Sequence, residues 1–246
     1  MRNGLWTMLG GLLSAVPTDG GGQAGVESRT VRIGADAYSY QVHVPSKLRS
    51  ERDLPVIVFL HGINERGTGG FVPTEGAAGA LVRHYLEQIP AIVLLPQCRP
   101  TSYWSDPSME QMVTGALDQT VAEFGADARR LYLLGVSMGG YGVWNVAAHQ
   151  TGRFAAIVSI CGGSPLRTGD RFTPIARKVG KTPSWLFHGA EDRVVPASES
   201  RQMVEALRGA GADVRYSEYP GVGHNVWMKV LAEKELMPWL LSQRLV

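Results

Sequence analysis

The chain has 246 residues, of which 44% are hydrophobic, and its formal net charge is +2. This length and apolar content suit one α/β domain with a sizeable core, whereas the small charge and the lack of a dense Lys/Arg run argue against nucleic acid as a partner. No apolar run approaches the roughly 18 residues of a membrane-spanning helix, so no membrane span is expected.

Residues 1–25 differ in composition from the rest and are treated as a separate N-terminal segment. Arg2 precedes an apolar stretch from Leu5 to Val16, and a glycine tract follows. This resembles a weak secretory signal with Gly22-Gln23-Ala24 as a cleavage site, and the alternative is a loosely docked tail. The compartment, cytoplasmic or secreted, therefore stays open.

The first half of the remaining chain is expected to begin with a hairpin and continue with buried strands. Period-2 alternation predicts two paired strands, and continuous apolar runs predict central strands. The expected strands are Val31–Ile33, Tyr38–Val44, Leu54–Leu60 and Ala91–Leu95, and the expected helices are Gly76–Ile89 and Met109–Phe124.

The second half alternates strand and helix patterns. The expected strands are Leu131–Leu134, Phe154–Ile160, Ser184–Phe187 and Val214–Tyr219. One helix is expected to follow the first of these strands and to end at about His149, and two more are expected over Ser198–Arg208 and Val230–Ser242. Such alternation from residue 54 onwards predicts a mostly parallel sheet covered by helices on both faces. We expect residues 26–246 to form a single domain.

Residues 131–147 contain the clearest chemical signal. The apolar run ending at Leu134 is followed by Gly135-Val136-Ser137-Met138-Gly139, which fits G-x-S-x-G, and then by a helical pattern. The pentapeptide alone is a weak signal in a glycine-rich chain and is also compatible with a serine in an ordinary turn. Its strand–turn–helix context, however, is that of a nucleophile elbow, where glycines allow a turn sharp enough to expose the serine hydroxyl.

Two further candidates stand at the ends of later strands. Asp192 follows the strand over 184–187, and His224 follows the strand over 214–219. Reactive groups gather at the carboxyl ends of parallel strands, and the chain order Ser, Asp, His is that of an α/β-hydrolase triad. Glu191 is an alternative to Asp192 as the acid.

From about residue 30 to its end, the chain resembles the α/β-hydrolase superfamily. The resemblance rests on Leu60-His61-Gly62, the G-x-S-x-G elbow, the H-G-x-x-D-x-x-V-P stretch from His188, and the G-x-G-H ending at His224. Within this superfamily, the chain looks like small carboxylesterases related to feruloyl esterases, polyhydroxybutyrate depolymerases and proteins labelled as predicted peptidases. This likeness rests on the oxyanion-loop stretch from His61 to Gly67, on Pro96-Gln97-Cys98 and on Tyr103-Trp104.

The resemblance implies a Ser-His-Asp mechanism. Ser137 would be the nucleophile, His224 the base that takes its proton, and Asp192, which the family pattern prefers over Glu191, the group that orients the imidazole. The backbone N–H groups of Ile63 and Met138 would form the oxyanion hole. The histidines at 61 and 188 would be structural, as they usually are in this family.

Trp104 and Tyr141 are possible substrate-binding residues because each lies near a strand end or the elbow, although packing is the more common role of an aromatic there. The segment between the strands ending at residue 160 and beginning at residue 184 leaves room for little more than one helix. It is basic and polar, so we expect an open cleft without a large lid domain.

The cysteines test the predicted strand order. In the strand order that the resemblance implies, the 91–95 strand lies on one side of the 56–60 strand, and the 131–134 and 154–160 strands lie on the other. Cys98 and Cys161 would then follow strands three positions apart, roughly 14 Å at about 4.8 Å per strand, whereas a disulfide needs Cα atoms within about 7 Å. Both should be free thiols. Neither lies in a C-x-x-C pair and no His/Cys cluster has zinc-like spacing, so no metal or cofactor is expected.

The sequence thus predicts a serine carboxylesterase acting on small-molecule or polymer-borne esters, with short-chain or aryl esters favoured. The alternatives are a peptidase or amidase with the same triad, a feruloyl- or polyester-type esterase acting on polymers, and a non-catalytic binding protein on a hydrolase fold. Intact candidates at 137, 192 and 224 argue against the last. The oligomeric state is left open.

Overall fold

The computed structural model describes residues 26–68 and 88–246. The predictions for residues 1–25 lie outside the described residues. The predicted helix over residues 76–89 also lies outside them, except for Gln88 and Ile89, which belong to a turn and a bend.

An eight-stranded sheet forms the centre of the structure, in the order β1-β2-β4-β3-β5-β6-β7-β8. The strands are β1 (Val26–Ile33), β2 (Asp36–His43), β3 (Val56–Leu60), β4 (Ile92–Pro96), β5 (Leu131–Val136), β6 (Ala156–Ile160), β7 (Ser184–Gly189) and β8 (Val214–Tyr219). β1 pairs with β2 and β2 with β4 in antiparallel fashion, and every other pairing is parallel. This confirms the predicted α/β-hydrolase sheet with antiparallel first strands.

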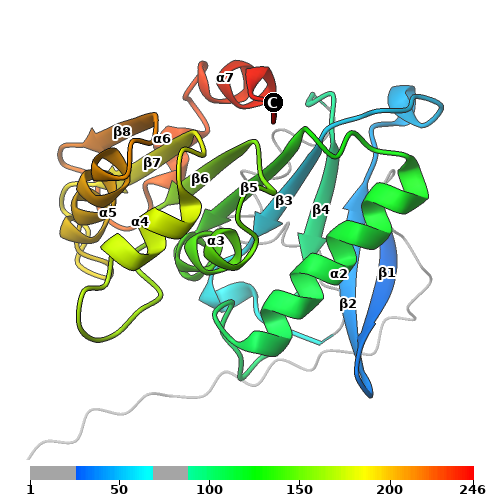
Figure 1. Cartoon of the computed structure of the whole chain (residues 1–246), viewed down its shortest axis with the longest axis horizontal. Coiled ribbons are helices and arrows are strands. Elements are labelled where there is room, and N and C mark those ends of the chain that lie inside the picture. The colour runs from blue at the N-terminus through cyan, green and yellow to red at the C-terminus, as the bar shows by residue number, and fades with distance from the viewer. Residues whose placement is uncertain (1–25, 69–87) are drawn as a thin grey trace, which may run out of the picture.

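Helices cover both faces of the sheet (Figure 1). On one face lie α2 (Pro107–Phe124), α3 (Met138–His149), α4 (Thr173–Val179) and α5 (Ser198–Gly209), and on the other lie α6 (Trp227–Val230) and α7 (Leu236–Ser242). Short 3-10 turns occur at η1 (Ser46–Leu48) and η2 (Ile63–Glu65).

The continuous apolar run of β3 reflects burial on both faces. Val56, Val58 and Leu60 belong to the apolar cluster under α2–α5, whereas Ile57 and Phe59 belong to the cluster under α6 and α7. Successive side chains of a strand point to opposite faces, so a strand between two helical layers needs an apolar residue at every position. β3 lies next to β5, which leads into Ser137.

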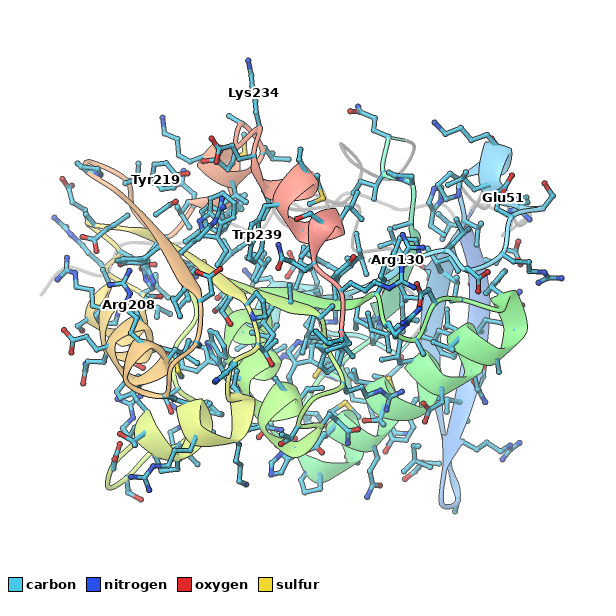
Figure 2. All side chains as sticks on the ribbon, turned by 45° about the horizontal axis from the view of Figure 1, so that its top comes forward. Glu51, Arg130, Arg208, Tyr219, Lys234 and Trp239 are labelled. Atoms are coloured by element: carbon cyan, nitrogen blue, oxygen red, sulfur yellow. The ribbon has the colours of Figure 1, made fainter. Side chains whose placement is uncertain are left out.

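The C-terminal helix differs from its prediction. A single helix over Val230–Ser242 was expected, but the helix α6 ends at Val230 and α7 begins at Leu236. Pro238 explains the break, because proline lacks the N–H of an interior helical bond but is tolerated in the first turn of a new helix. Trp239 of α7, labelled in Figure 2, packs edge-on against Trp185 of β7, with ring centroids 5.3 Å apart.

The connection between β6 and β7, residues 161–183, contains the seven-residue helix α4. Its apolar residues Ile175, Ala176 and Val179 are buried against the core, and the helix packs on α3 and α5. This connection therefore adds no lid domain, as predicted.

The strand order also confirms the cysteine prediction. β4, which precedes Cys98, and β6, which precedes Cys161, are separated by β3 and β5, and both cysteines are buried free thiols. Within residues 26–68 and 88–246, no helix combines the length and apolar character needed to cross a membrane.

Candidate active site

Ser137 occupies a strained turn between β5 and α3. Its φ of 53° and ψ of −114° lie in a region that non-glycine residues rarely adopt, as expected for the predicted nucleophile elbow and not for an ordinary turn. β5 is buried along its whole length between β3 and β6, and α3 starts directly at Met138. The rigid strand and helix hold the serine in this conformation.

Glycines make the tight turn possible. A Cβ on Gly135 would lie 2.2 Å from the carbonyl oxygen of Gly139, and a Cβ on Gly139 would lie 1.9 Å from the carbonyl oxygen of Leu60. Both distances are far below any van der Waals contact, so α3 can approach the sheet this closely only without side chains at these positions. These collisions explain why the sharp turn expected from the sequence needs glycine at positions 135 and 139.

The structure brings Ser137, His224 and Asp192 together from the ends of β5, β8 and β7. The Ser137 Oγ lies 2.9 Å from the His224 Nε2, and the His224 Nδ1 lies 2.6 Å from the Asp192 Oδ2. Because an ionised carboxylate can only accept, Nδ1 carries the proton and Nε2 is free to accept the serine hydroxyl proton. The His224 ring also packs edge-on against Trp227, with centroids 5.8 Å apart.

Backbone hydrogen bonds fix the Asp192 carboxylate. Its Oδ1 accepts from the N–H groups of Val194 and Val195 at 2.8 and 2.9 Å, which leaves Oδ2 directed at His224. The Asp192 side chain is fully buried. Glu191, the alternative acid, is exposed, so the geometry favours the aspartate.

Two buried histidines support the loops around these residues. His188 accepts a hydrogen bond from the Ser200 hydroxyl at Nδ1 (2.7 Å) and donates from Nε2 to the Val195 carbonyl (2.9 Å). His61 donates from Nδ1 to the Gly62 carbonyl (2.7 Å), and its Nε2 accepts from the Cys98 N–H (3.0 Å). Each ring thus acts as donor on one nitrogen and acceptor on the other, which requires the neutral form.

Burial lowers the pKa of His61 to about 4 and also lowers the pKa of His188. In the unfolded chain both would titrate near 6.5, so below that pH the unfolded state binds more protons than the folded state. We therefore expect the free energy of unfolding to fall as the pH is lowered from 7 to 5, with His61 alone contributing about 2 kcal/mol and His188 adding in the same direction.

Urea unfolding at pH 7, 6 and 5 measures this loss while most carboxylates stay ionised. Histidine NMR on the folded protein is the control, because the His61 ring should remain neutral at pH 5. A free energy of unfolding that is unchanged between pH 7 and 5, or a His61 ring that protonates near pH 6.5, would contradict the prediction.

The two expected oxyanion-hole residues lie beside the serine. Ile63 begins η2 after β3, Met138 begins α3, and both line the same cleft as Ser137. Among the described residues, neither backbone N–H donates to another protein group. The first N–H groups of a helix have no partner within it, so both are available to an incoming oxyanion.

A cleft of about 220 Å³ opens at Ser137. Trp104 and Tyr141 both contribute to its wall, as the sequence suggested. The Trp104 ring is almost fully buried and its Nε1 donates to the His61 carbonyl at 2.9 Å, so it also holds the β3–η2 loop. Burial raises the pKa of Tyr141, which keeps its hydroxyl protonated.

The other described residues that line the cleft were not among the predicted substrate-binding residues. They are Tyr103, Ser105, Pro165, Arg167 and Val194. The first two neighbour Trp104 and Val194 follows Asp192 in the loop, so proximity to predicted residues was a usable signal for them. Arg167 was visible only as one of several basic residues between β6 and β7.

Cys161 lies close to His224 and Asp192. Its Sγ, a ring nitrogen of His224 and a carboxylate oxygen of Asp192 all lie within 4.8 Å of one another. Thiol, imidazole and carboxylate groups are all common metal ligands. A thiol must lose its proton to bind a metal, however, and burial strongly raises the pKa of Cys161. The carboxylate and imidazole are already hydrogen-bonded to each other, so the arrangement fits a hydrogen-bonded triad better than a metal site.

The remaining histidines lie away from Ser137 or outside the described residues. His43 is buried in β2, and His149 is at the end of α3, where its Nδ1 contacts Glu110 at 2.9 Å. His84 lies outside the described residues.

A family model described as phospholipase/carboxylesterase matches residues 104–235, more than half of the chain. The chain belongs to this family. The match includes Ser137, Asp192 and His224, so the geometry described above lies within the shared region.

Individual relatives agree with this assignment. The chain is 42% identical over 55 residues to acyl-protein thioesterase 1 of Gibberella zeae, covering 22% of this chain and 23% of the relative. It is 26% identical over 128 residues to the carboxylesterase SOBER1 of Arabidopsis thaliana, covering 52% and 54%. A crystal structure of a thermostable esterase has a TM-score of 0.79 at 32% identity, covering 89% of this chain and 63% of that one. The chain thus spans less than two thirds of each.

Proposed function

We propose that this member of the phospholipase/carboxylesterase family hydrolyses carboxylic esters through an acyl-enzyme intermediate. The hydrogen-bonded chain from Ser137 through His224 to Asp192 carries the proposal. A serine hydroxyl becomes an effective nucleophile when a base within hydrogen-bond reach removes its proton, and that base needs a third group to orient it. Both contacts exist here, at the floor of a cleft.

The proposed reaction proceeds in two stages. The Ser137 Oγ attacks the ester carbonyl carbon while His224 takes its proton, and the oxyanion binds the N–H groups of Ile63 and Met138. The intermediate collapses, the C–O bond to the alcohol breaks, and His224 returns the proton to the leaving oxygen. A water molecule then attacks the acyl-serine with His224 again as base, which releases the acid and restores the serine.

The cleft favours short-chain or aryl esters. Its volume of about 220 Å³ is smaller than the roughly 300–1,000 Å³ of sites that enclose drug-sized ligands, and its wall is rich in aromatic and apolar side chains. The helix α4 packs into the core instead of covering the site. We therefore expect activity on dissolved esters without the interfacial activation of a lidded lipase.

The test is a set of p-nitrophenyl esters from C2 to C12, assayed beside a feruloyl ester, an acyl thioester and an aminoacyl p-nitroanilide. We expect kcat/KM to peak at short chains, with anilide cleavage near background, because amide cleavage requires protonation of a poorer leaving group. Dominant anilide turnover would replace the proposal with a peptidase, and activity confined to feruloyl or polymeric esters would replace the small-molecule substrate with a polymer.

A further inference from the structure

Arg167 is the only charged residue among the described residues that line the cleft at Ser137. The other described residues of the lining are apolar, aromatic or neutral and include no carboxylate. Arg167 is exposed, so solvent screens its charge in part, but a cation among otherwise uncharged lining residues attracts an anionic group and repels a cationic one. Arg167 therefore makes this cleft favour ligands that carry a negative charge.

Neighbouring arginines are already engaged, whereas Arg167 is not. Arg171 forms two 2.8 Å bonds with the carboxylate of Glu199 on α5. Arg66 donates to the carbonyl groups of Ile63 (3.1 Å) and Ser102 (3.3 Å). Within residues 26–68 and 88–246, Arg167 has neither a hydrogen-bond acceptor nor an ion-pair partner. Its guanidinium is available to a ligand.

The loop that carries Arg167 is held on both sides. The Ser164 N–H donates to Glu199 at 3.1 Å and its hydroxyl to the Arg171 carbonyl, while the Leu166 N–H donates to the Ser164 Oγ at 3.3 Å. The Arg171 Nε returns to the Leu166 carbonyl at 2.9 Å. These bonds tie the loop to α5, so the backbone at Arg167 does not have to be ordered when a substrate binds.

We propose that Arg167 selects esters that also carry an anionic group, a carboxylate above all, separated from the ester by a short apolar spacer. This deepens the proposed ester hydrolysis and rests on it. The planar guanidinium matches a carboxylate with two parallel hydrogen bonds, and the cleft wall around Tyr141 and Pro165 suits the spacer. Arg167 is then a specificity residue that contacts the substrate away from the reacting carbon.

Two matched ester pairs test the proposal from either side of the ester bond. On the acyl side, the mono-p-nitrophenyl ester of adipic acid is compared with its methyl ester. On the alcohol side, 4-acetoxybenzoate is compared with methyl 4-acetoxybenzoate. We expect the wild type to favour the charged member of at least one pair, and Arg167→Gln to lower kcat/KM for that member about tenfold while the neutral member changes less than about twofold.

Arg177→Gln is the matched control, because Arg177 is an exposed arginine of the same β6–β7 connection and does not line the cleft. It removes the same charge and should leave both members of each pair unchanged. Arg167→Lys keeps the charge but loses the planar fork and should fall between Arg167→Gln and the wild type. Added salt should reduce the wild-type preference.

Failure of this inference is distinct from failure of the proposed function. If neutral esters are hydrolysed in a Ser137-dependent manner but neither pair responds to Arg167→Gln, the function stands and the role of Arg167 is refuted. If no ester is hydrolysed, the role of Arg167 can still be tested by calorimetric binding of the charged esters to Ser137→Ala and to the double variant that also carries Arg167→Gln. About tenfold weaker binding to the double variant supports the inference, and equal binding overturns it.

Discussion

Replacing Ser137 by alanine is expected to lower kcat by a factor on the order of 10⁶ while the fold is retained. The change removes the oxygen that would attack the ester, so His224 and Asp192 keep their positions but have no hydroxyl to activate. Alanine retains the Cβ and loses one hydrogen bond, and therefore adds no new clash in the elbow. Activity on a p-nitrophenyl ester and the thermal melting temperature measure the two effects separately.

Cys161 provides the control for this variant, since its thiol is the other nucleophile close to His224 and Asp192. A fluorophosphonate probe should label the wild type and Cys161→Ala but leave Ser137→Ala unlabelled. Labelling or turnover that persists in Ser137→Ala would refute the serine mechanism. Labelling lost in Cys161→Ala, with that variant still folded, would point to the thiol instead.

Replacing Gly139 by alanine is expected to cost both stability and activity. The new Cβ would lie 1.9 Å from the Leu60 carbonyl oxygen and 2.9 Å from that of His61, and backbone atoms cannot rotate away as a side chain can. α3 or β3 must shift, which we expect to cost at least about 3 kcal/mol. For a chain of this size the melting temperature should fall by about 10 °C. Because α3 begins at Met138, the same shift displaces both Ser137 and the proposed oxyanion donor.

Gly209→Ala is the matched control for this prediction. Gly209 also lies in a helix, α5, but a Cβ there would meet no atom within 4 Å. That substitution should be neutral or stabilise the protein by up to about 1 kcal/mol, because alanine is the better helix former. Equal melting temperatures for the two variants would show that the approach of α3 to β3 is looser than the structure indicates.

The central strands of the sheet were predictable because burial on both faces requires an apolar residue at nearly every position of a strand. β3 and β5 are apolar at nearly every position, a pattern that depends on the residues themselves and not on their neighbours in space. The elbow was equally visible, since glycines at 135 and 139 are needed by a local turn. The C-terminal helix was predicted as one element, although Pro238 in the first turn of α7 is a local sign that a new helix begins there. The sequence contained this information, and the prediction overlooked it.

Residue types and their order along the chain were enough to name Ser137, Asp192 and His224 as candidates, because parallel strands bring their carboxyl ends to one edge of the sheet. Tertiary contacts were needed to show that Asp192 and not Glu191 meets His224, which lies 32 positions further along the chain. They also decided that Glu199 pairs with Arg171 and that Arg167 is left facing the cleft. The Arg171–Glu199 and Asp192–His224 pairs join residues 28 and 32 positions apart. Only the folded backbone determines which of several equivalent charges meet.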